Sequence, residues 1–198
     1  GYTFAGVWQE DDVNAPFVDA NGQTNGKTNG EVYKVKPGNS KYVDVNKDGV
    51  YNDADQGIIG CGQPTFNWGW NNTFNYKNFD FSFFVVGFHG FDIYNATHQM
   101  GYNLIKSQQM AGVTPMRELL NRWTPTNTNT DIPGFVKGGT ENKDFFSTRF
   151  VENGSFIKMK SITLGYTLPE ATCRSLGINN LRVYASVQNP FHITKYSG

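Results

Sequence analysis

The segment between residues 44 and 55 has the composition of a calcium-binding loop. Oxygen-bearing side chains stand at its first, third and fifth positions, a glycine stands at the sixth, where a sharp turn is needed, and an aspartate stands at the twelfth. Calcium takes about six to eight oxygen ligands, and a backbone carbonyl at the seventh position can supply one of them. The spacing therefore predicts a structural calcium site with the ligands Asp44, Asn46, Asp48, Val50, Asn52 and Asp55.

Two features separate this loop from an EF-hand. Its twelfth position is Asp55, which reaches less far than the usual glutamate, and no helical pattern flanks the loop. We therefore expect weak affinity, with a dissociation constant on the order of 10⁻⁴–10⁻³ M, as in extracellular calcium modules. The role of the ion would be structural, holding this loop in one conformation. The alternative is an Asx-rich turn that satisfies its own backbone and binds no metal.

No other pattern in the sequence predicts catalysis or a second metal site. Paired carboxylates occur only in the loop 44–55, and the histidines, which are His89, His98 and His192, show no ligand spacing. Cys61 and Cys173 form neither a metal motif nor a disulfide framework, and we expect them on opposite sides of the molecule as two free thiols. The sequence therefore predicts that the protein is not an enzyme.

Charge and composition narrow the class of protein further. Lysine plus arginine equals aspartate plus glutamate, at 17 each, and no basic cluster is present, so the sequence predicts no nucleic-acid partner. Aromatic residues make up 15% of the 198 residues, which is far too many for a disordered chain. No run of about 18 apolar residues could form a transmembrane helix, whereas membrane-spanning strands remain compatible with the sequence.

The elements that position these residues are two hairpins of long strands. From residue 65 the even positions are aromatic except for Asn72, the odd positions are small or polar, and the alternation resumes after a turn at Lys77-Asn78. A second hairpin runs from Ser155 to Thr194 with a reversal at 169–180. Its apolar phase slips upstream of Ser161, which indicates a β-bulge near Lys160 or a strand that leaves its apolar surroundings.

The length of these strands favours a membrane protein. They are about twice the usual five or six residues of a globular strand, and about 9–11 residues suffice to cross a bilayer at a tilt. The alternative is a secreted, calcium-stabilised β-sandwich that binds glycans, in which Phe66, Trp68 and Trp70 would be buried between two sheets. The two interpretations differ in whether the aromatic face contacts lipid or protein.

Several ordered motifs resemble the C-terminal barrel region of the SusC/RagA family of TonB-linked outer-membrane transporters. They are Gly154-Ser155-Phe156-Ile157-Lys158, the run from Ile162 to Pro169, Leu181-Arg182-Val183-Tyr184, Gln188-Asn189-Pro190-Phe191 and Lys195-Tyr196-Ser197-Gly198. The resemblance implies an all-β fold, namely a portion of a large transmembrane antiparallel β-barrel of about 22 strands with long extracellular loops. No plug domain or TonB-contacting segment is recognisable, so the chain is expected to be a piece of a larger protein.

The resemblance also implies a function. Members of this family import oligosaccharides or peptides across the outer membrane of Bacteroidetes-type Gram-negative bacteria, with energy delivered through TonB and with a SusD-like surface lipoprotein as partner. Which residues bind the substrate is not indicated by the sequence.

On this basis the chain divides into four regions of one incomplete barrel domain. Residues 1–63 form an extracellular loop region with the calcium-type loop, 64–91 form a barrel hairpin, 92–149 form a long extracellular loop, and 150–198 form a second barrel hairpin. Within the loops, Thr114-Pro115 predicts a short helix over residues 115–123. Asn29-Gly30 is expected to close a small hairpin before residues 31–35.

Overall fold

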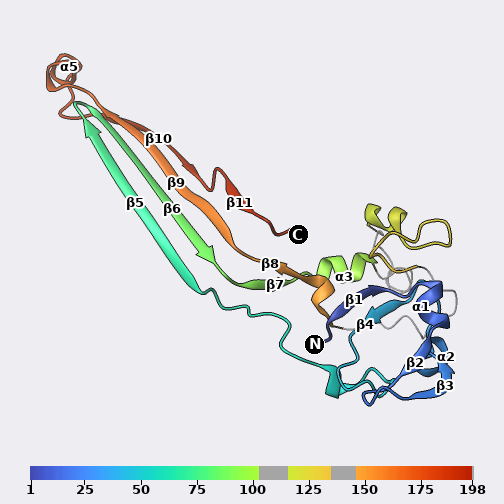
Figure 1. Cartoon of the computed structure of the whole chain (residues 1–198). Helices are drawn as coiled ribbons and strands as arrows, with labels where there is room; N and C mark the ends of the chain where they lie inside the picture. The colour runs from blue at the N-terminus through green and yellow to red at the C-terminus, as the bar shows by residue number, and fades with distance from the viewer. Residues whose placement is uncertain (103–115, 135–145, 198) are drawn as a thin grey trace. The chain divides into compact units, whose positions relative to one another are not determined.

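A computed structural model describes residues 1–102, 116–134 and 146–197 of the chain. These residues form two compact units (Figure 1). Unit 1 comprises residues 1–60 and 94–151, and unit 2 comprises residues 61–93 and 152–197. The predictions for Thr114 and Pro115 lie outside the described residues.

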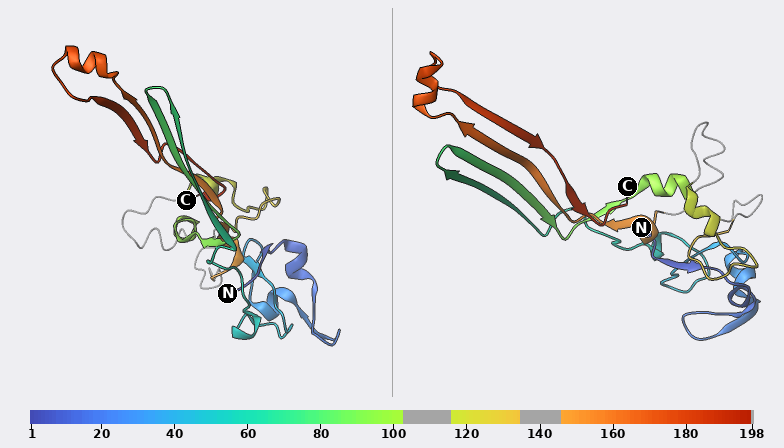
Figure 2. Two further views of the ribbon diagram at one scale, coloured as in Figure 1. Left: turned by 90° about the vertical axis from the view of Figure 1, so that its left-hand side faces the viewer. Right: turned by 90° about the horizontal axis from the view of Figure 1, so that it is seen from above.

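Unit 2 is built from one antiparallel sheet of long strands. The strand order is β10-β9-β6-β5, and β11 pairs with β9 beside β10 (Figures 1 and 2). The strands are β5 (Phe66–Tyr76), β6 (Phe79–His89), β9 (Phe156–Thr167), β10 (Arg182–Gln188) and β11 (His192–Thr194). With 11, 11 and 12 residues, β5, β6 and β9 have the length that the alternation predicts.

The predicted turn and the predicted bulge are both present. Lys77 adopts a left-handed conformation (φ 53°) in the two-residue turn between β5 and β6. In the pairing of β6 with β9, Phe84 is opposite Ser161 and Val85 is opposite Met159, so Lys160 is the extra residue. The bulge restores the apolar phase, because it returns Met159 and Ile157 to the face that carries Ile162.

The last predicted strand is interrupted. Asn189 has a positive φ (51°) and Pro190 has no backbone N–H, so the ladder breaks between β10 and β11. The break lies beside the bulge, because the Asn189 N–H donates to the Lys160 carbonyl (3.0 Å). The reversal at 169–180 also contains a short helix, α5 (Glu170–Ser175), which holds the buried Cys173.

Unit 1 contains short elements around an aromatic core. They are β1 (Phe4–Val7), α1 (Glu10–Asn14), β2 (Pro16–Val18), β3 (Thr24–Thr28), α2 (Asn29–Tyr33), β4 (Ser40–Tyr42), η1 (Asp53–Asp55), α3 (Ala96–Tyr102), η2 (Arg117–Asn121) and η3 (Thr148–Phe150). β1 pairs with β4 and β2 pairs with β3. A further pair, β7 (Asp92–Tyr94) with β8 (Val151–Asn153), has most of its residues in unit 2. The buried apolar side chains of this unit include Trp8, Phe17, Tyr42 and Phe150.

Two local expectations for this unit are corrected. Residues 29–33 form helix α2 and no strand of a hairpin, because Thr28 and Glu31 form a reciprocal capping box at its start. The helix predicted over residues 115–123 is a 3₁₀-helix limited to Arg117–Asn121 in the described part. It stops there because the Trp123 N–H donates to the Ile132 carbonyl (2.8 Å) and is therefore withdrawn from the helix.

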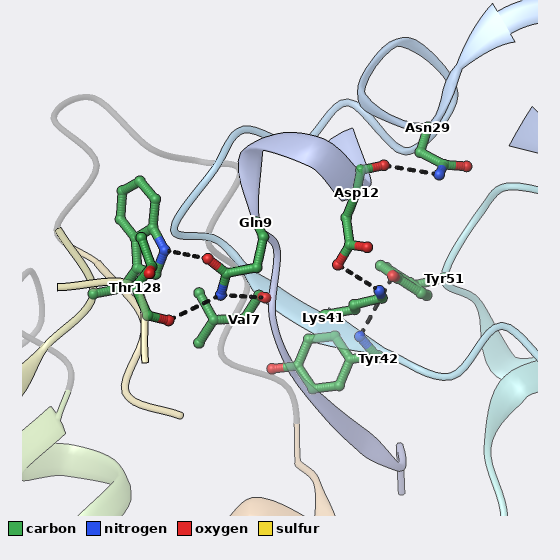
Figure 3. Close-up of polar contacts among 9 residues, drawn as sticks. Val7, Gln9, Asp12, Asn29, Lys41, Tyr42, Tyr51 and Thr128 are labelled. Carbon is green, nitrogen blue, oxygen red and sulfur yellow. Dashed lines mark hydrogen bonds and ion pairs between the residues drawn. The ribbon is translucent and has the colours of Figure 1, made fainter. Parts of the chain in front are cut away.

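Side-chain contacts hold residues 117–134 onto the N-terminal segment. The indole N–H of Trp123 donates to Gln9 Oε1 (2.9 Å), and Gln9 Nε2 donates to the carbonyls of Val7 and Thr128 (Figure 3). Nearby, Lys41 Nζ donates to Asp12 Oδ2 (2.9 Å). These bonds satisfy polar groups that the short elements leave unpaired.

Candidate functional site

The calcium-type loop is organised around the carboxylate of Asp44. Its Oδ2 accepts hydrogen bonds from the Gly49 N–H (2.8 Å) and from the Tyr33 hydroxyl (2.9 Å). Its Oδ1 is buried and has no hydrogen-bond partner in the described part of the chain. Such an oxygen is costly unless something else pairs with it, and a cation is one such partner.

The other predicted ligands mostly bond to the loop backbone. Asn46 Oδ1, Asp48 Oδ1 and Asn52 Oδ1 each accept from the N–H two residues further on, which is the geometry of an Asx-turn. Buried Asp55 accepts from the N–H groups of Val45 (2.8 Å) and Asn52 (3.0 Å). The Val50 carbonyl accepts from Asn52 Nδ2 (3.3 Å).

These contacts bring the two ends of the loop together without arranging its carboxylates around one point. Across the described ranges 1–102, 116–134 and 146–197, no three His, Cys, Asp or Glu side chains group as a metal site. Any cation here would therefore need amide and carbonyl oxygens in addition to carboxylates. The Val50 N–H and, secondarily, the Asn46 side chain lower the pKa of Asp48, which keeps that carboxylate charged.

The aromatic side of the loop is formed by two stacked tyrosines. The rings of Tyr33 and Tyr51 lie 5.2 Å apart, and Tyr33 also contacts the rings of Trp8 and Phe17. Burial, followed by the hydrogen bond to Asp44, raises the pKa of Tyr33. Burial raises the pKa of Tyr51 to about 12. Both phenols therefore remain protonated at neutral pH, and the Tyr33 hydroxyl remains a donor to Asp44.

A second candidate site is the face of the unit 2 sheet that carries its aromatic side chains, hereafter the aromatic face. Its exposed apolar members include Phe66, Trp68, Trp70, Phe74, Tyr76, Phe79, Leu164, Val183 and Val187. Trp68, Trp70 and Leu164 are 38%, 55% and 51% exposed, respectively. Within the described residues these side chains are therefore not buried beneath a second sheet, as a β-sandwich would require.

The opposite face of the sheet is polar near the turns. Asp80 of β6 and Arg182 of β10 form a two-pronged ion pair that passes over Gly165 of β9, with Arg182 Nε 3.0 Å from Asp80 Oδ1. A Cβ at position 165 would collide with both side chains, so glycine makes room for the pair. Thr163 and Ser186 add a cross-strand hydrogen bond of 2.9 Å. Toward the other strand ends this face carries Phe84 and Phe88.

The remaining candidates stay separate. The three histidines lie on different elements: His89 ends β6, His98 is in α3, and His192 begins β11. Cys61 is exposed, Cys173 is buried, and both are free thiols, as predicted. No helix within the described residues has both the length and the apolarity to cross a membrane.

One cavity in unit 1 was not foreseen. Its volume is about 250 Å³, and Arg149, Phe150, Glu118 and Asp131 are among the residues that line it. The guanidinium of Arg149 lies 5.0–5.3 Å from the ring centres of Tyr102, Phe150 and Phe4. Because these residues are far apart in the sequence, no local pattern could have indicated the cavity.

Comparisons with known proteins match all or most of this chain to small parts of longer ones. No family model matches it. It is 32% identical over 198 residues to TonB-dependent receptor P3 of Formosa agariphila, which covers all of this chain and 18% of that receptor. It is 31% identical over 165 residues to the TonB-dependent receptor SusC of Bacteroides thetaiotaomicron, which covers 82% of this chain and 15% of SusC. The chain therefore spans about a fifth or less of the length of these curated relatives.

Solved structures of longer proteins contain a part with a fold similar to that of this chain. A structure of the RagAB peptide transporter matches with a TM-score of 0.69 at 21% identity, over all of this chain and 19% of that chain. The RagAB peptide importer in its open-open state matches with a TM-score of 0.68 at 20% identity. At these identities the likeness concerns the fold.

Proposed function

This chain belongs to the SusC/RagA family of TonB-dependent receptors, and we propose that it forms wall strands and surface loops of an outer-membrane importer. Its fold is that of a portion of the large antiparallel β-barrel of such transporters. The complete receptor would import oligosaccharides or peptides with energy supplied through TonB. A SusD-like lipoprotein would be its surface partner, and its location would be the outer membrane of a Bacteroidetes-type bacterium.

The exposed aromatic face carries this proposal. Large apolar side chains on 11-residue strands are 38–70% exposed along the whole of β5, which is the side that a barrel presents to lipid. A strand of about 9–11 residues crosses the bilayer at the tilt of a barrel. Near the turns the opposite face, with the ion pair of Asp80 and Arg182, has the polar character of a barrel interior.

Spin labels on neighbouring residues of β5 test this orientation. In the receptor with Cys61 and Cys173 both replaced by serine, single cysteines would be introduced by Trp70→Cys and Phe74→Cys, with Asn71→Cys and Thr73→Cys as matched controls one residue away. We expect labels at 70 and 74 to collide mainly with oxygen, which partitions into lipid, and labels at 71 and 73 mainly with a polar nickel chelate. Equal nickel access at all four positions would refute a lipid-facing wall.

We also propose that the loop 44–55 binds Ca²⁺ as a structural ion. The buried, unpartnered Oδ1 of Asp44 supports this proposal, as do the loop's fold around Gly49 and the proximity of Asp55 to Val45. The side-chain oxygens of Asp44, Asn46, Asp48, Asn52 and Asp55 and the carbonyl of Val50 would hold the ion, which would fix the loop.

Removal of calcium should therefore loosen this loop. We expect chelation to increase proteolytic cleavage near residues 44–55, and Asp44→Asn to abolish the protection that millimolar Ca²⁺ restores. Asp53→Asn is the matched control, because Asp53 lies in the same segment outside the predicted ligand positions. Cleavage that is identical with and without Ca²⁺ in the unaltered receptor would exclude calcium binding and leave the Asx-turn alternative.

A further inference from the structure

We infer that Tyr33 is the residue that positions Asp44 for metal binding, and that it couples the loop to helix α2. This inference rests on the calcium binding proposed above. Tyr33 lies outside the twelve-residue motif, in the last turn of α2, and its hydroxyl donates to Asp44 Oδ2 at 2.9 Å. It therefore contacts the first predicted ligand from a different element.

The hydrogen bond from Tyr33 makes the two carboxylate oxygens of Asp44 inequivalent. Oδ2 already accepts from Tyr33 and from the Gly49 N–H, whereas Oδ1 is buried without a partner in the described residues. With Oδ2 held on both sides, rotation of the carboxylate is restricted, and Oδ1 is the oxygen left for a cation. Outer-shell hydrogen bonds of this kind orient ligands, and their loss commonly weakens metal affinity about 10- to 100-fold.

The ring of Tyr33 is fixed before any ion arrives. It lies 5.5 Å from Trp8, 5.7 Å from Phe17 and 5.2 Å from Tyr51, measured between ring centres. A side chain held on three sides loses little rotamer entropy when its hydroxyl forms a further bond. The geometry of the ligand is therefore set by the aromatic core of unit 1.

A second contact ties the same loop to α2. Gly49 has a positive φ of 83°, and a Cβ there would collide with Val32 of α2 and approach the Phe17 ring at 3.5 Å. The loop therefore packs closely on α2 at two adjacent residues, Val32 and Tyr33. An ion that rigidifies the loop should accordingly stabilise the docking of α2, and the reverse must hold as well.

Calcium and terbium titrations of the receptor test the positioning role of Tyr33. Calorimetry would give the Ca²⁺ dissociation constant. The midpoint of a titration followed by tyrosine-sensitised Tb³⁺ luminescence would give the apparent affinity for Tb³⁺. We expect Tyr33→Phe to weaken both about 10-fold. Tyr42→Phe is the matched control, because Tyr42 is a buried tyrosine of the same core, and it should change affinity less than about twofold. Melting in chelator would confirm that both variants fold.

The possible outcomes distinguish the positioning role of Tyr33 from the proposed calcium binding on which it rests. If the unaltered receptor binds neither ion, the calcium site itself is refuted. If it binds but Tyr33→Phe has the affinity of the unaltered receptor, the positioning role is refuted and the calcium site stands. Equal weakening by both variants would attribute the effect to core packing and would also refute the role of the Tyr33 hydroxyl.

Discussion

Trp123 packs closely against two glycines of unit 1. Its ring lies against Gly38, whose φ is +91° and where a Cβ would come within 2.6 Å of Trp123 Cε3. Gly134 lies on the same ring, and its N–H donates to the Gly38 carbonyl at 2.8 Å. Together with the bond to Gln9, these contacts attach residues 117–134 to the N-terminal segment.

Gly38→Ala should therefore be more disruptive than a glycine substitution that is strained by φ alone. Gly26→Ala is the control, because Gly26 also has a positive φ (77°) but has nothing within 4 Å of the added Cβ. We expect about 1 kcal/mol of destabilisation for Gly26→Ala, from the left-handed conformation. For Gly38→Ala we expect a further 1–3 kcal/mol or so, because the indole must move.

Hydrogen exchange at the Gly134 amide is a direct measurement of this difference. Exchange should accelerate in Gly38→Ala and stay unchanged in Gly26→Ala. The same rate in both variants would mean that Trp123 does not depend on the bare backbone of Gly38.

At the scale of the elements, alternation predicted β5, β6 and β9 because successive side chains of a strand point to opposite faces of the sheet, and the two faces lie in different environments. The slip of phase also located the bulge at Lys160. Helix α2 was missed although Thr28 and Glu31 carry the capping-box pattern, since Asn29-Gly30, which lies between them, favours a turn equally well. The break at Asn189-Pro190 was missed because apolar alternation continues on both of its sides.

Two aromatic rings cover glycines in the hairpin of β5 and β6. Trp68 lies over Gly87 on the aromatic face, and Phe84 lies over Gly69 on the opposite face. A Cβ at position 87 would lie 2.6 Å from Trp68 Cζ2 and still closer to Cε2 and Nε1 of the same ring. A Cβ at position 69 would lie 3.3 Å from Phe84 Cε2. The two sites differ in how much room their ring leaves.

Gly87→Ala should accordingly destabilise the sheet more than Gly69→Ala. We expect about 1–3 kcal/mol for position 87, where Trp68 is displaced. For position 69 we expect less than about 1 kcal/mol, because the alanine also restricts the unfolded chain. The temperature at which the receptor loses its compact form on a gel in detergent would rank them. Equal temperatures would show that Trp68 adapts without cost.

At the scale of the whole molecule, contacts between distant residues could not be foreseen. Asp80 and Arg182 are 102 residues apart, and Gln9 and Trp123 are 114 apart, so no local spacing brings either pair together. The calcium-type loop was visible because its residues are adjacent, but Tyr33 lies eleven residues before Asp44 on another element. Ligand residues within one segment can be predicted from their spacing in the sequence, whereas the residues of other elements that hold them in place cannot.

A charge placed on one face of β5 should be far more costly than on the other. Trp70→Lys puts an ammonium on the aromatic face, where the lipid environment that we propose costs about 2–4 kcal/mol near the bilayer centre. Asn71→Lys, one residue further on the opposite face, should cost little. Folding into lipid vesicles, followed by urea titration, would compare the two. Similar stabilities would contradict a hydrocarbon environment for Trp70.

Within the described residues, β5 pairs on one side only, with β6, and β10 and β11 pair only with β9. Each outer margin of the sheet therefore offers a row of amide and carbonyl groups to any strand that comes near. A fragment that ends at these edge strands would tend to self-associate through them. Measurements on such a purified fragment would then describe its aggregation and not the behaviour of the receptor. Biochemical work on these residues is best done inside the parent receptor, where neighbouring strands can satisfy both margins.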